Sequence, residues 1–67
     1  MKKKELVEQI LIILNWAQEN REYRNNVESA LDGVNWYLSN KLMSRVLMRL
    51  TRDRLIRMHH DVIESIY

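Results

Sequence analysis

The sequence predicts an all-α protein, and three observations lead to this fold class. The 67 residues contain no proline and a single glycine, so the usual signals for tight β-hairpins are missing. No segment shows the strict alternation of apolar and polar residues that a half-buried strand requires. Apolar residues instead recur every three or four positions, which is the spacing of one face of a helix. We therefore expect one helical domain spanning residues 1–67.

The composition is that of a folded chain near the lower size limit for a single core. Apolar residues make up 46% and charged residues 30%, which is too hydrophobic for a disordered segment. Without cysteine, neither a disulfide nor a thiolate zinc site can support the fold. The longest aliphatic run, residues 10–14, is far shorter than the roughly twenty residues of a membrane span. We expect a cytoplasmic protein with no membrane segment, supported by a second subunit.

The first helix is expected from Lys3 to Glu19, where straight-chain residues favour helical backbone. Five apolar residues form its inward stripe: Leu6, Ile10, Ile13, Leu14 and Ala17. Ile12 and Trp16 lie one turn apart on the opposite, otherwise acidic side. A polar connection over residues 20–25 is expected to follow.

The second helix is expected to begin at Asn25 or Asn26, whose side chains can cap its first turn, and to end near Leu38. Its inward stripe contains Val27, Ala30, Leu31, Val34, Tyr37 and Leu38. Trp36 faces the other way. Gly33 falls inside this helix, where glycine costs about 1 kcal/mol relative to alanine.

Two architectures are open for residues 41–66, after a turn at residues 39–40. One apolar stripe contains Leu42, Met43, Val46, Leu47 and Leu50, and a nearly opposite one contains Leu55, Met58, Val62 and Ile66. If Thr51 caps a new helix, the chain is a compact four-helix unit. If one rod continues, the fold is a three-helix bundle or helical hairpin with a long C-terminal helix. We favour the rod, with a break near residue 51 as its variant.

The rod architecture predicts a homodimer, because its second half would have no apolar partner within its own chain. The expected self-association surface contains Leu55, Val62, Ile63, Ile66 and Tyr67.

The outward tryptophans predict contact with another protein. Tryptophan is enriched at the centres of interfaces because it buries a large rigid area. The expected anchors are Ile12, Trp16 and Trp36. In the alternative interpretation, the two indoles cover gaps at the edges of the helical core. We favour the interface, because no polar function accounts for the isoleucine beside Trp16.

A row of basic residues gives a second functional hypothesis. Residues 41–67 carry six Lys/Arg and three Asp/Glu, whereas residues 1–40 carry five and six. The candidate nucleic-acid contacts are Lys41, Arg45, Arg49, Arg52, Arg54 and Arg57, the first four of which form one row on a helix. A solvated helix face is the alternative interpretation. Against a helix-turn-helix, we expect no turn of three or four residues before Thr51.

The sequence contains no pattern typical of catalysis or metal binding. A lone glycine excludes a glycine-rich phosphate loop, and no hydrolase or metalloprotease motif occurs. His60 and Glu64 can supply two ligands on one helix face, where a structural zinc needs four. We expect no enzyme, no cofactor, no metal site and no small-molecule substrate.

Together these patterns predict a small non-enzymatic regulator or inhibitor that binds a partner macromolecule through helix surfaces. The alternative is a nucleic-acid-binding transcriptional regulator that uses the basic C-terminal helix. The two differ in salt dependence, because binding to phosphates weakens steeply as salt rises.

Overall fold

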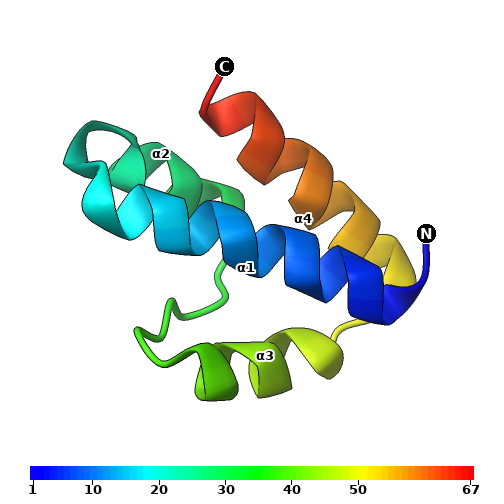
Figure 1. Cartoon of the computed structure of the whole chain (residues 1–67). Coiled ribbons are helices and arrows are strands. Elements are labelled where there is room, and N and C mark those ends of the chain that lie inside the picture. The colour runs from blue at the N-terminus through cyan, green and yellow to red at the C-terminus, as the bar shows by residue number, and fades with distance from the viewer.

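Four α-helices and no strands make up the computed structural model, which describes residues 1–67 and confirms the all-α class (Figure 1). The helices are α1 (Lys3–Glu19), α2 (Arg21–Ala30), α3 (Asn40–Met48) and α4 (Arg52–Ser65). The longest of them, α1, contacts all three others, and α4 also packs on α2. Figure 1 shows α2 and α4 on one side of α1 and α3 on the other.

Twelve buried apolar residues form one core, with no buried polar side chain among them. They are Leu6, Val7, Ile10, Leu14, Ala17, Val27, Leu31, Met43, Leu47, Leu55, Met58 and Val62. Every helix contributes, and α1 contributes most. Each helix therefore has one face committed to the core and another available for contacts with other molecules.

The bounds predicted for the first helix are confirmed, but the polar connection predicted over residues 20–25 is wrong. Asn20 alone joins α1 to α2. Its side-chain amide donates to the carbonyl oxygen of Trp16 at 2.8 Å and so satisfies a free acceptor at the end of α1. Because one residue completes the turn, residues 21–25 are free to start the next helix.

The predicted extension of the second helix to Leu38 is also wrong, since α2 ends at Ala30. Asp32 and Gly33 have positive φ values of 52° and 84°, which end the helix. Gly33 therefore supplies a turn conformation instead of a helix interior. Residues 31–39 form an irregular connection, in which Tyr37 and Leu38 are exposed instead of inward-facing.

The favoured rod over residues 41–66 is contradicted, because residues 49–51 separate α3 from α4. The Thr51 hydroxyl accepts a hydrogen bond from the backbone N–H of Arg54 at 3.2 Å, as an N-cap does. The physical reason lies in the two opposite apolar stripes. Only a break between them lets the stripes of α3 and α4 enter the same core. The compact four-helix architecture, which we ranked second, describes the chain.

Candidate functional site

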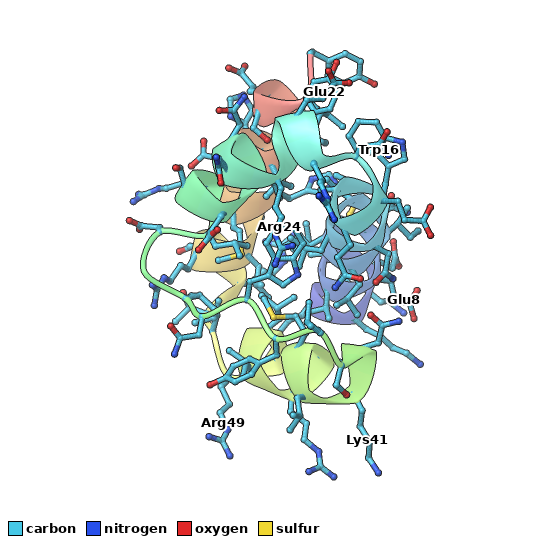
Figure 2. The ribbon with its side chains drawn as sticks, turned by 90° about the vertical axis from the view of Figure 1, so that its left-hand side faces the viewer. Glu8, Trp16, Glu22, Arg24, Lys41 and Arg49 are labelled. Atoms are coloured by element: carbon cyan, nitrogen blue, oxygen red, sulfur yellow. The ribbon has the colours of Figure 1, made fainter.

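The outward face of α1 is the leading candidate site. Ile12 lies opposite the buried stripe of the helix and is 61% exposed. Trp16, one turn further on, is 41% exposed, and Figure 2 shows its side chain pointing away from the body of the molecule. Glutamates share this side of the helix. The α1 face consists of Glu5, Glu8, Ile12, Trp16 and Glu19, all of them exposed.

Trp16 is supported by an aromatic neighbour that the sequence analysis missed. Its ring centroid lies 5.1 Å from that of Tyr23, with the two planes tilted by 42°. Aromatic pairs of this kind contribute about 0.5–1.5 kcal/mol beyond the area they bury. The indole is therefore positioned before any partner arrives, which reduces the entropy lost on binding. This pair was not predictable while residues 20–25 were expected to be a connection.

Trp36 does not belong to the same surface as Trp16. It is partly buried and packs against the core from the connection between α2 and α3. The guanidinium of Arg24 lies 5.4 Å from the centre of its ring, a cation–π contact. Figure 2 shows Arg24 on the side facing the viewer, whereas Trp16 lies at the edge of the view. Trp36 therefore fits the alternative interpretation, in which an indole covers a gap at the edge of the helical core, better than the role of an interface anchor.

The predicted self-association surface does not exist as one patch. Leu55 and Val62 are completely buried in the chain's own core. Ile63 and Ile66 are partly buried, and only Tyr67, which is 97% exposed, is fully available. The reason is the break before α4, which turns the helix back onto α1 and α2. The core of this chain covers the stripe that we had expected a second subunit to cover.

The outward face of α3 is the second candidate site. Lys41 and Arg45 are four residues apart, and Arg49, the C-cap residue of α3, continues the row after four more. Figure 2 shows Lys41 and Arg49 projecting away from the body of the molecule. Two exposed apolar residues that the sequence analysis did not place at a surface site, Leu42 and Met48, flank the row on either side. These five residues form the α3 face.

Arg52, Arg54 and Arg57 lie on α4 and do not extend the α3 face along one helix. Arg52 donates from Nε and Nη2 to the carbonyl oxygen of Met1, at 3.1 and 2.9 Å. Arg54 donates to the carbonyl oxygen of Asp32 at 3.2 Å. Two of the six candidate nucleic-acid contacts therefore hold the chain's own backbone.

The break before α4 corrects the expectation that no short turn precedes Thr51. Three residues, 49–51, connect the two helices, which is the length found in helix-turn-helix motifs. However, α3 packs mainly on α1, and α4 packs on α1 and α2. The spacing thus occurs without the close pairing of two helices that presents a recognition helix to DNA.

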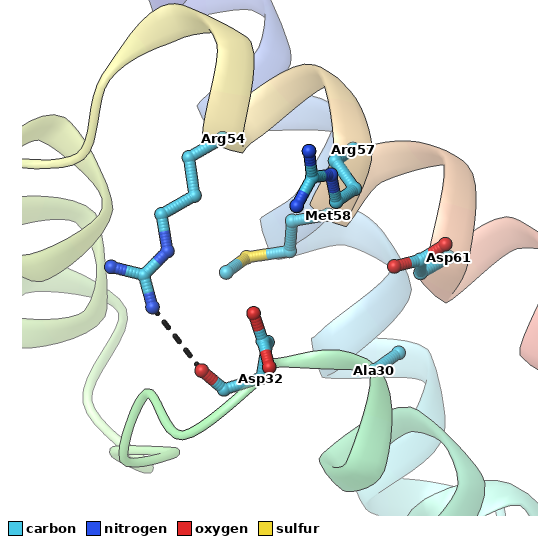
Figure 3. Close-up of a pocket in the computed structure, with 6 residues that line it drawn as sticks. All are labelled: Ala30, Asp32, Arg54, Arg57, Met58 and Asp61. Carbon is cyan, nitrogen blue, oxygen red and sulfur yellow. Dashed lines mark hydrogen bonds between the residues drawn. The ribbon is translucent and has the colours of Figure 1, made fainter.

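The remaining polar features are small. Arg57 and Asp61 help to line a hollow of about 10 Å³, on the scale of one water molecule (Figure 3). His60 lies 3.3 Å from Glu64, as the predicted pair requires, and 3.6 Å from Asp61.

No group of three or more His, Cys, Asp or Glu side chains is arranged to hold a metal ion. No helix has both the length and the apolar character to cross a membrane.

Comparison with known protein families, with curated proteins and with solved structures finds no match to this chain.

Proposed function

We propose that this chain is a small, non-enzymatic cytoplasmic interaction protein that binds a protein partner through the α1 face. The observation that carries this proposal is the position of Ile12, at the centre of a surface that the chain's own core does not need. A side chain of this size buried in a partner contributes about 1.5–3 kcal/mol. Trp16, already supported by Tyr23, adds a rigid aromatic anchor one turn away.

The charges of the α1 face indicate the kind of partner surface that fits it. Glu5, Glu8 and Glu19 surround the apolar pair, and none of them forms an ion pair within the chain. A partner that presents exposed apolar side chains beside basic ones would cover Ile12 and Trp16 while pairing these carboxylates. Such binding would regulate or inhibit by occupying the partner's surface.

A photo-crosslinking residue placed at position 12 tests this proposal. We expect a crosslinked protein product from position 12 and none from Asn26, a matched exposed position on α2. Trp16→Ala should reduce the yield from position 12 at least several-fold, with the helical circular dichroism unchanged. Equal crosslinking from positions 12 and 26, or a yield that Trp16→Ala leaves unchanged, would contradict the assignment of the α1 face.

Nucleic-acid binding through the α3 face is the second candidate, and one observation favours it. No acidic residue occurs between Asp32 and Asp53, so the basic row has no negative neighbours in its own segment. Three phosphate contacts would give a slope of about −2.7 in a plot of log affinity against log salt. Affinity for a short DNA duplex should fall in Arg45→Glu/Arg49→Glu. The Lys4→Glu/Arg21→Glu control, which has the same net charge, should lose much less affinity for the duplex.

A further inference from the structure

The outward charges around Ile12 on α1 and those of the α3 row differ in sign, although Lys4 at the start of α1 is also exposed. All three glutamates of α1 lie on its outward side around Ile12. The helix α3 contains no acidic residue, and Lys41, Arg45 and Arg49 form its outward row. Figure 2 shows labelled members of the two faces, Glu8 and Lys41, pointing in different directions. One molecule therefore presents an acidic surface with an apolar centre and a basic surface with apolar flanks.

Neither set of charges is paired within the chain. The only ion pairs shorter than 4 Å belong to His60, on α4. The charged groups of both faces are thus free to pair with groups on another molecule. The apolar residues are free as well, because Ile12, Leu42 and Met48 all lie outside the core.

The dimensions of the two faces are compatible. Lys41 and Arg49 are eight residues apart, or about 12 Å along a helix. Glu5 and Glu19 are fourteen residues apart, or about 21 Å. The basic row therefore fits within the length of the acidic face. Leu42 and Met48 on its two sides supply apolar surface for Ile12 and Trp16.

We propose that the partner of the α1 face is the α3 face of a second copy of this chain. This inference rests on the proposed function, since it names the occupant of the same protein-binding surface. The contact is heterologous, because two different surfaces meet. Each copy in a pair keeps one free face, so that association continues into a ring or an open chain of copies.

The size of the molecule permits two such contacts. A standard interface buries about 800 Å² on each partner. Two contacts on one copy would use about a third of its surface of 4807 Å². A nucleic acid on the α3 face would leave Ile12 and Trp16 exposed to water. A second copy covers the apolar residues of both faces and pairs their charges, and it is therefore the occupant that the surfaces fit best.

Two variants, each lacking one face, test this contact. Ile12→Lys places a like charge opposite the basic row, and Arg45→Ala/Arg49→Ala removes most of that row. All three residues are exposed, so the fold should persist in both proteins. Asn26→Lys and Arg21→Ala/Arg57→Ala are matched controls on α2 and α4. Solution mass is measured by light scattering at ~100 µM, where micromolar association is populated.

We expect the unaltered chain and both controls to exceed the mass of one chain, and this excess to fall as salt rises. Each face variant alone should have the mass of one chain. Their equimolar mixture should have twice that mass and no more, because only one of the two contacts can form between them. This restoration distinguishes a contact between the α1 face and the α3 face from one that joins two copies of the same face.

Two results would overturn the inference. The first is an unaltered chain that stays monomeric at ~100 µM, whether or not its α3 face binds a DNA duplex. The second is association of the unaltered chain without restoration in the mixture. Crosslinking from position 12 to a different protein, with a monomeric chain, would reject self-association and leave the proposed function standing. Absence of any crosslink from position 12 would reject both.

Discussion

At the scale of the residue, Gly33 shows how one position determines where an element ends. Its φ of 84° is strained for any residue with a side chain, and a Cβ added there would meet nothing within 4 Å. Backbone conformation, not lack of space, therefore requires glycine at this position. Asp32 before it also has positive φ, a conformation that aspartate adopts more readily than most residues.

Replacing Gly33 with alanine should lower the free energy of unfolding by about 1–2 kcal/mol, the cost of the left-handed conformation. Urea unfolding followed by circular dichroism measures this change. Gly33→Asn is the control. Because asparagine tolerates positive φ, this variant should lose clearly less stability than Gly33→Ala. Equal losses in the two variants would show that the strain lies elsewhere.

Two aliphatic residues of α1, Ile12 and Leu14, differ in exposure, and we expect them to differ in role. Ile12 is 61% exposed, whereas Leu14 is 1% exposed and belongs to the core. Leu14→Ala should therefore cost about 2–5 kcal/mol of stability, as large-to-small core substitutions do. Ile12→Ala should change the midpoint of thermal unfolding only slightly. A large loss in Ile12→Ala would assign the residue to folding and remove it from the candidate site.

At the scale of the element, the turn between α3 and α4 depends on its cap. Thr51 has an extended backbone and accepts from the backbone N–H of Arg54, while Asp53 places a negative charge in the first turn of α4. Both features stabilise the start of a helix. The turn is therefore encoded locally, even though it contains no glycine.

Thr51→Ala should destabilise the protein by about 1 kcal/mol, because the exposed amide of Arg54 loses its acceptor. Thermal unfolding followed at 222 nm measures the effect. Thr51→Ser retains the hydroxyl and should behave much like the unaltered chain. If Thr51→Ser lost as much as Thr51→Ala, the methyl group and not the cap would be responsible.

The same elements show what the sequence can predict. The residues of α1 were correct to both ends, since its apolar spacing is regular and unambiguous. The end of α2 was missed because Gly33 fits either a helix interior or a turn, and only its φ distinguishes the two. The break at Thr51 was among the alternatives. Choosing it required knowing that α1 and α2 could cover the stripe of α4, which depends on contacts distant in sequence.

The candidate surfaces were predictable to a similar extent. Ile12 and Trp16 were found because their phase on α1 was correct. Trp36 was misplaced because its phase was read on a helix that had already ended. Leu42 was expected in the core because the bounds of α3, and hence its inward direction, were unknown. Errors in surface assignment therefore followed directly from errors in helix bounds.

At the scale of the whole molecule, one core joins all four helices, so that no helix pair has a core of its own. We expect a single cooperative unfolding transition. Trp16 on α1 and Trp36 in the connection report from different places, so Trp16→Phe and Trp36→Phe proteins can be followed separately by fluorescence. Their urea midpoints should coincide with that from circular dichroism in each protein. Separate midpoints would show that α3 and its connection unfold independently.

The packing of α1 on α4 also has a consequence for synthesis on the ribosome. These helices stand at opposite ends of the chain, yet their contact is the most extensive in the molecule. Forty-six residues separate the end of α1 from the end of α4, which take about 2–9 s to translate at 5–20 residues per second. During that time the apolar stripe of α1 lacks its main cover. We therefore expect chaperones that recognise apolar segments to bind the nascent chain until α4 has emerged.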